Sequence, residues 1–188
     1  MNEWMDNYRE FRKNILLIGQ YLMASMRKEL YEQKHINTGK LDSSFTMSET
    51  ETLDSIVLEI YANESSEVLE TGTTAKNILF TLSRSGTSKK SEYINGLIRW
   101  VSTKFGVGGL EAKKIAFAIA RVQSQYGMPT PNSRALHQDS QRIHWLTRTI
   151  NRESPKMDKM LDKAFEAFVS TAIISMFDAT QRVVNSVK

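Results

Sequence analysis

The side chains best suited to chemistry in this chain of 188 residues are few and lie far apart along the sequence. His137 and His144 are seven residues apart, which on one helix is about 10.5 Å of axial rise, too far for both rings to bind one metal ion. Glu67 and Glu70 have a helical spacing, but no His or Ser constellation accompanies them for acid–base or nucleophilic catalysis. The sequence therefore predicts no enzyme, no metal site and no cofactor.

The composition excludes several further classes of protein. The chain contains no Cys, which rules out disulfides, thiolate metal sites and a Cys nucleophile. Its apolar runs fall short of the roughly 18 residues that a membrane-spanning helix needs, and the N-terminus lacks the apolar core of a secretory signal, so no membrane partner is expected. A formal net charge of +4 permits an acidic partner without requiring one.

The strongest helical pattern covers residues 4–30. The apolar residues there recur every three or four positions, as they do on one stripe of a helix, and the stripe is wide enough to pack on more than one neighbour. Aromatic side chains in such a stripe can stack on nucleic-acid bases, but they more often form protein contacts. We expect contact with another subunit through Trp4, Tyr8, Phe11, Ile15 and Ile18.

Period-two alternation after this helix predicts a small antiparallel β-sheet. One strand is expected over residues 41–47 and the other over residues 56–61, joined by an exposed acidic connection over residues 48–54. Residues 63–91 have the composition of a loop, apart from the apolar segment 78–82, which is either a third strand or a buried turn.

The second half of the chain has helical patterns. Apolar spacing predicts helices over residues 94–105 and 111–126, the first of them ending at Gly106. The two prolines within residues 127–131 break the chain, and a weaker helix is expected over residues 139–152.

Ser154 and Pro155 are typical of a helix start, with Ser as the N-cap and Pro at the first helical position. A last long helix is expected to begin there, with an apolar stripe formed by Met157, Met160, Leu161, Ala164, Phe165, Phe168, Ala172 and Met176. The predicted fold is α+β and mainly α-helical. It is expected to form a single domain, with a helix-and-hairpin module over residues 1–90 and a helical portion over residues 91–188.

The segment 106–115 resembles the helix-hairpin-helix module of DNA-binding proteins. In that module, glycines let a turn approach a phosphate, amide groups at the next helix start face the anion, and lysines add positive charge. The sequence departs from the module at Lys104, where an apolar residue is usual, and a glycine-rich link between two packed helices is the alternative. The residues that would contact DNA are Gly106, Gly108, Lys113 and Lys114.

Three short motifs in the first half resemble, in the same order, those of tail-completion and head-to-tail joining proteins of tailed bacteriophages. A T-G-x-L-x-x-S run, which begins the first strand in that family, follows the long helix, a Y-A pair closes the second strand, and an E-x-G-T run comes next. Residues 63–67 are an insertion relative to the family pattern. The matching residues are Thr38, Gly39, Leu41, Ser44, Tyr61, Ala62, Glu70, Gly72 and Thr73.

This resemblance implies a structural virion protein that is made in the cytoplasm of the bacterial host. Its copies would form a ring at the head–tail junction, between a portal or adaptor protein and the tail proteins, with DNA passing through the ring. Gly39 would release the chain from helix into strand, and Gly72 from strand into loop. Glu70 is expected to cap a turn or to pair with a basic residue across a subunit boundary, or else to be a solvated acid. A non-specific DNA-binding protein that uses the glycine-rich turn is the alternative function.

Overall fold

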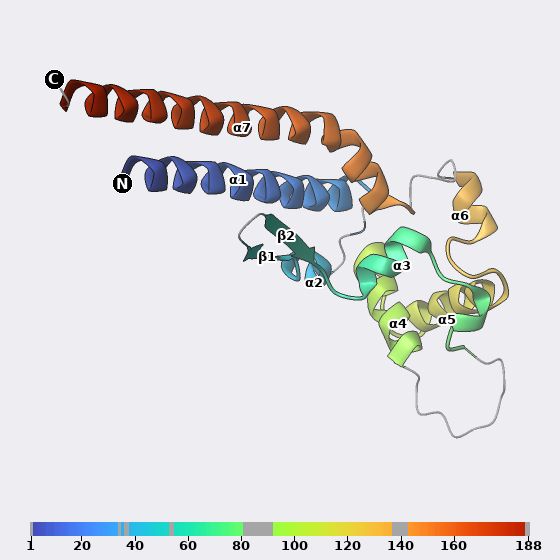
Figure 1. The fold of residues 1–188 in the computed structure, drawn as a ribbon. Coiled ribbons are helices and arrows are strands. Elements are labelled where there is room, and N and C mark those ends of the chain that lie inside the picture. The colour runs from blue at the N-terminus through green and yellow to red at the C-terminus, as the bar shows by residue number, and fades with distance from the viewer. Residues whose placement is uncertain are drawn as a thin grey trace. The chain divides into compact units, whose positions relative to one another are not determined.

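The computed structural model describes residues 2–33, 35, 38–52, 55–80, 92–136 and 143–186. It confirms a mainly α-helical α+β fold with a long N-terminal helix, an antiparallel pair of strands and a helical C-terminal half (Figure 1). The elements in chain order are α1 (Asn2–Glu32), α2 (Lys40–Ser43), β1 (Thr46–Glu51), β2 (Ile56–Tyr61), α3 (Ser65–Thr71), η1 (Ala75–Asn77), α4 (Glu92–Phe105), α5 (Gly109–Tyr126), α6 (Pro131–Leu136) and α7 (Trp145–Ser186).

The chain forms two compact units, each built from separate parts of the sequence. Unit 1 contains Met1–Arg27, Thr46–Tyr61 and Arg148–Lys188, and unit 2 contains Lys28–Phe45 and Ala62–Thr147. This grouping differs from the expected division into residues 1–90 and 91–188, because the first and last long helices belong largely to the same unit.

In unit 1, α1 and α7 pack against each other as antiparallel helices (Figure 1). The ring of Phe168 lies 5.0 Å from the Phe11 ring and 5.3 Å from the Trp4 ring, measured between centroids. The Asn7 side-chain amide donates a hydrogen bond of 2.9 Å to the Phe168 carbonyl oxygen. Farther along the pair, the Tyr21 hydroxyl bonds to the Glu153 carboxylate. Aromatic rings prefer particular relative orientations, so these contacts favour one arrangement of the two helices in addition to burying apolar area.

The β1–β2 hairpin packs on another face of α1. Its register pairs Thr46 with Tyr61 and Glu51 with Ile56. A Cβ atom on Gly19 of α1 would lie 2.6 Å from the Met47 sulfur and 2.9 Å from Leu58 Cδ1, so a glycine there permits close approach of the hairpin.

The expected strand boundaries need correction at both ends of the first strand. Leu41 and Ser43 lie in the short helix α2, not in a strand, and Gly39 precedes that helix with φ 74°. Strand β1 also continues to Glu51, into the segment predicted as an acidic loop. The acidic residues suit a strand because Glu49 and Glu51 accept hydrogen bonds from α1, as described below. Leu53 and Asp54 of the predicted connection lie outside the described residues.

In unit 2, α4 and α5 form a helical pair joined by residues 106–108. Val101 of α4 is buried against Ala112 and Ala116 of α5, and all three have no exposed surface. The small alanine side chains let the two helix backbones approach closely. Both predicted helices and the break after Tyr126 are confirmed, with α5 beginning two residues earlier than expected.

Three further short helical segments were not predicted. The segment 63–91 contains α3 and η1, and α6 follows the break at residues 127–131. Within the described part of the segment 78–82, Ile78–Phe80 form no strand, so the two-stranded β1–β2 pair is the sheet that the structure describes. Residues 81–82 lie outside that part of the chain.

The predicted helix boundary at Ser154 and Pro155 is wrong. Helix α7 runs without a break from Trp145 to Ser186, with Pro155 in its interior, and the Ser154 hydroxyl bonds back to the Ile150 carbonyl. A proline inside a helix costs about 3 kcal/mol. Tertiary contacts on both sides of Pro155 offset this cost, since Glu153 bonds to the Tyr21 hydroxyl and Lys156 Nζ lies 4.1 Å from the centre of the Tyr21 ring.

Candidate functional site

Several residues of the phage-like motifs lie where one segment of unit 2 is bonded to another. The first such place joins the end of α2 to the chain that leaves β2. The Ser44 hydroxyl donates a 2.7 Å hydrogen bond to the Leu41 carbonyl and accepts one of 3.1 Å from the Asn63 amide, directly after Ala62. Ser44 of the first motif is therefore bonded to the residue that directly follows the Tyr61–Ala62 pair.

The other residues of these two motifs have smaller roles. The Thr38 hydroxyl accepts a 3.5 Å hydrogen bond from the Lys40 amide at the start of α2. Tyr61 ends β2, as predicted, and its side chain is exposed. The Glu59 carboxylate raises the pKa of the Tyr61 hydroxyl by accepting its hydrogen bond.

The second fastening place is Glu70, which caps the start of α7. One Glu70 carboxylate oxygen accepts a 2.8 Å hydrogen bond from the Leu146 amide, and both oxygens lie 3.4 Å from the Thr147 amide. The Thr147 hydroxyl also donates to this carboxylate, and His144 Nδ1 lies 3.7 Å from it. The first amides of a helix have no hydrogen-bond partner within the helix, and a carboxylate near them also interacts favourably with the positive end of the helix dipole. Of the roles expected for Glu70, the structure shows a cap, made to a helix far away in sequence.

A buried tryptophan holds the same helix start from the side. Trp145, the first residue of α7, is 1% exposed, and its indole N–H donates a 3.1 Å hydrogen bond to the Ser66 carbonyl in α3. Its ring lies 5.9 Å from the Phe45 ring in an edge-to-face arrangement. Helix α3 therefore supplies both the carboxylate cap and the acceptor for the indole.

The third fastening place is a short antiparallel bridge between Thr73 and Met128. The two residues exchange backbone hydrogen bonds of 2.8 and 2.7 Å. A glycine precedes each of them, Gly72 with φ 75° and Gly127 with φ 76°. An added Cβ on Gly72 would overlap the Met128 carbonyl oxygen, and one on Gly127 would overlap the Thr73 carbonyl oxygen. Gly72 therefore ends a helix, α3, and not a strand as predicted, and it is needed for both its conformation and its lack of a side chain.

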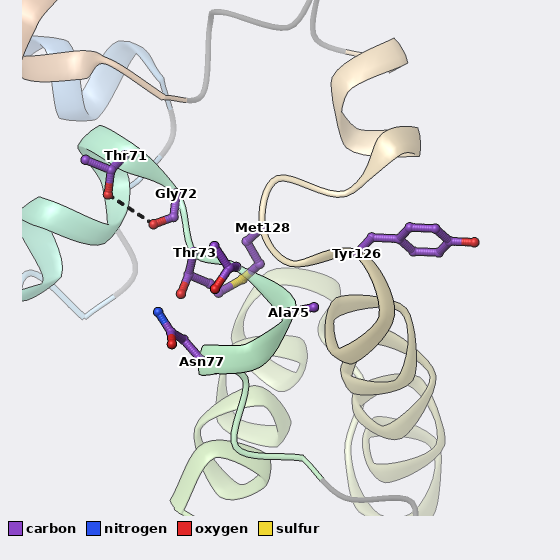
Figure 2. A pocket seen from close by; sticks show the side chains of 8 residues that line it. Thr71, Gly72, Thr73, Ala75, Asn77, Tyr126 and Met128 are labelled. Atoms are coloured by element: carbon purple, nitrogen blue, oxygen red, sulfur yellow. Dashed lines mark hydrogen bonds between the residues drawn. The ribbon is translucent and has the colours of Figure 1, made fainter.

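A hollow of about 440 Å³ lies beside this bridge, as Figure 2 shows. Threonine and asparagine side chains supply its polar atoms, whereas the Tyr126 side chain points away from the threonines (Figure 2). No acidic, basic or histidine side chain is among the described residues that line it. The lining residues are Thr71, Gly72, Thr73, Thr74, Ala75, Asn77, Tyr126 and Met128.

Metal-binding clusters are likewise absent from the described ranges, which hold no group of three or more His, Asp or Glu able to bind a metal ion. His144 takes part in the cap of α7, and His137 lies outside those ranges. Among the helices that the structure describes, none combines the length and the apolarity needed to cross a lipid bilayer.

The carboxylates with shifted pKa values serve packing in unit 1. Arg12 donates hydrogen bonds of 2.6 and 2.9 Å to the two oxygens of Glu49, which lowers the pKa of the Glu49 carboxyl and raises that of the Arg12 guanidinium. The neighbouring Glu51 accepts a hydrogen bond from the Tyr8 hydroxyl, which raises the pKa of Tyr8. A hydrogen bond from Tyr21 lowers the pKa of Glu153. Each shift thus comes from a contact between α1 and a neighbouring element.

The predicted subunit-contact residues of α1 are in part used within the chain. The rings of Trp4, Tyr8 and Phe11 all contact Phe168 of α7. Tyr8, Phe11, Ile15 and Ile18 are half-buried, whereas Trp4 remains 52% exposed. A contact between subunits at these positions stays a prediction, and Trp4 offers it the most surface.

A larger exposed apolar surface lies on α7, for which the sequence predicted a single apolar stripe. Ala164 of that stripe is buried and Phe168 faces α1, but Leu161, Phe165 and Met176 are exposed. Further exposed apolar residues on this helix are Ile173, Ile174, Phe177, Val183 and Val184. The sequence contains a signal for this surface, since residues 167–177 carry no charge and their apolar side chains point to more than one side of a helix.

The glycine-rich turn of the DNA-binding alternative has the predicted local structure. Residues 106–108 join two packed helices, with φ 67° at Gly106 and 56° at Gly109. Added Cβ atoms on Gly106 and Gly108 would meet nothing within 4 Å, so the backbone there is open to approach. Lys113 and Lys114, in the first turns of α5, are exposed. The same geometry also fits a simple link between two packed helices.

No protein-family model, curated protein or solved structure matches this chain.

Loss of the Glu70 carboxylate should destabilise the start of α7. We expect Glu70→Ala to lower the free energy of unfolding by about 1–2 kcal/mol, the usual range for a lost helix cap, and to speed hydrogen exchange of the Leu146 and Thr147 amides. Urea unfolding and NMR exchange measure the two effects. Glu67→Ala, an exposed acid on the same helix, is the control and should change neither. Equal effects of both substitutions would contradict the assigned cap.

The two glycines at the Thr73–Met128 bridge should not tolerate a side chain. We expect Gly72→Ala and Gly127→Ala each to lower the free energy of unfolding by about 1–3 kcal/mol, because each residue has positive φ and its Cβ would overlap a backbone oxygen. Gly96→Ala in α4, where a Cβ meets nothing within 4 Å, should instead raise stability by roughly 0.5–1 kcal/mol. Thermal unfolding of the three variants tests this, and a neutral result at both bridge positions would refute the constraint.

Proposed function

We propose that this chain is a structural subunit of a tailed bacteriophage particle, forming a ring at the head–tail junction. In this role it joins a portal or adaptor protein to the tail proteins around the path of the DNA. It is made in the cytoplasm of the bacterial host, becomes part of the virion, performs no reaction and needs no cofactor.

The observation that carries the proposal is the exposed apolar surface of α7. The most exposed of its large side chains, Met176 and Phe177, have 70% and 72% of their surface accessible. Monomeric proteins seldom expose contiguous apolar patches larger than about 300–600 Å² without using them for interaction. A subunit that buries these apolar side chains against other subunits of an assembly accounts for this surface.

The phage-like motifs support the same role in a different way. Ser44, Glu70 and Gly72 all fasten one segment of unit 2 to another through hydrogen bonds or close backbone approach. Motif residues of this kind specify how a scaffold is held together. They suit a family defined by the shape of its subunit more than by a reaction.

Removing the protein should leave phage heads and tails unjoined. We expect an early stop codon in the gene, in the phage genome that carries it, to give DNA-filled heads and separate tails, seen by electron microscopy of lysates. Purified protein added to such a lysate should restore joined, infectious particles, because subunits can assemble from solution. Normal joined particles from the stop-codon mutant would refute the proposed role.

The open glycine turn with Lys113 and Lys114 beside it favours DNA binding as a second candidate function. On this alternative, the protein binds duplex DNA without sequence preference and with a steep salt dependence. Replacing Lys113 and Lys114 by Ala should then reduce the slope of log affinity against log salt by about one per lysine. Fluorescence anisotropy with a labelled duplex measures this slope, and negligible binding at moderate salt would remove the alternative.

A further inference from the structure

Helix α7 presents two exposed apolar faces besides the one that packs on α1. The first, which we call the α7 seam, consists of Leu161, Phe165, Val169 and Met176. These residues are spaced by four, four and seven, which keeps them on one side of the helix. The second, the α7 flank, lies next to it around the helix and consists of Ile173, Ile174, Phe177 and Val184.

The end of α7 extends beyond the helix that covers its beginning. Asn7 of α1 lies level with Phe168 of α7, as their hydrogen bond shows. Five residues of α1 precede Asn7, whereas eighteen residues of α7 follow Phe168. About 13 residues of α7, or roughly 20 Å of helix at 1.5 Å per residue, therefore extend past the start of α1. Figure 1 shows the end of α7 beyond the start of α1. Met176, Phe177 and Val184 lie in this extension.

A helix that is apolar on several sides is usually buried among neighbours. Along residues 167–177 there is no charged side chain, so like surfaces can meet there without electrostatic repulsion. Ala172 and Ala179 add small side chains seven residues apart, which let another helix approach closely. The chemistry of the extension thus fits a second apolar helix, and the chain itself supplies one.

We propose that the seam of α7 packs against the α7 flank of a second copy of this chain. The contact joins two different faces, so it is heterologous, and contacts of this kind form a ring when the rotation from copy to copy closes. The inference rests on the proposed function, because it assigns the contact between subunits of that ring to α7, where α1 was expected.

The exposed area is sufficient for a stable contact of this kind. Apart from the half-buried Val169, the seam and the flank contain seven exposed side chains, and their exposed fractions range from 45% for Leu161 to 72% for Phe177. With about 150–200 Å² for a large apolar side chain, they expose on the order of 700 Å² in total. Interfaces are about 57% apolar, so this corresponds to a contact of roughly 1,200 Å², within the range of specific protein–protein interfaces.

The test compares the oligomeric state of the full-length protein with that of exposed-site variants by sedimentation velocity. We expect the wild-type protein to form oligomers, and Met176→Glu in the seam or Phe177→Glu in the flank to weaken association at least about tenfold. The matched control is Leu110→Glu, which replaces an apolar side chain of similar exposure, 68%, in unit 2 and should leave association unchanged. Circular dichroism confirms that the helix content of each variant is intact, as expected at positions this exposed. Val184→Glu provides a further flank variant should one of them fail to fold.

Two results would overturn the proposal. One is a wild-type protein that stays monomeric at high concentration. This includes a monomer that binds phospholipid vesicles and loses that binding in Met176→Glu. The other is an oligomer that both Met176→Glu and Phe177→Glu leave intact. Failure here is distinct from failure of the proposed function, because the stop-codon experiment depends on joined particles and not on which helix makes the contact. Particles that need the protein, together with an oligomer insensitive to α7 variants, would refute only the α7 assignment.

Discussion

The placement of α7 is the constraint on which most of the structure depends. Its first residue, Trp145, is buried in unit 2 with its indole bonded to Ser66, and its first free amides are capped by Glu70. From Arg148 onward the same helix belongs to unit 1, where Phe168 is surrounded by aromatic rings of α1. Helices are stabilised mainly by packing and by satisfied ends, and α7 has both over its first half. This is why it continues through Pro155.

Unit 2 is held together by backbone contacts as much as by side chains. At the bridge between Thr73 and Met128, the two backbone segments lie so close together that only glycine fits at positions 72 and 127. The alanine residues of α5 play a comparable part against Val101 of α4. In both places a glycine or an alanine permits the close approach, so the packing depends on these residues being small.

Part of the exposed apolar surface of α7, including Met176, Phe177 and Val184, lies on the end of the helix that extends past the start of α1. Helix α1 alone could bury a single apolar stripe on α7. The seam and the flank of α7, however, lie on other sides of the helix and are exposed. This asymmetry, with a well-fastened beginning and an apolar extension, suits a helix whose second half is completed by other copies. It also agrees with the structural role inferred from the short motifs of the first half.

The sequence by itself determined the helical periodicity of α1, α4 and α5, the alternation of β2 and the break after Tyr126, because each depends on local spacing or on glycine and proline chemistry. It also singled out Glu70 and Gly72, although not their partners. Tertiary structure alone decided that Leu41 and Ser43 lie in a helix, that Glu49 and Glu51 extend a strand against Arg12 and Tyr8, and that α7 continues through Pro155. For the two glutamates and for the helix around Pro155, contacts with residues distant in the sequence outweigh a local preference of a few kcal/mol. The sequence also did not predict that Gly72 lies beside Gly127, or which sides of α7 are exposed. Only the folded chain shows which surfaces pack together and which remain exposed.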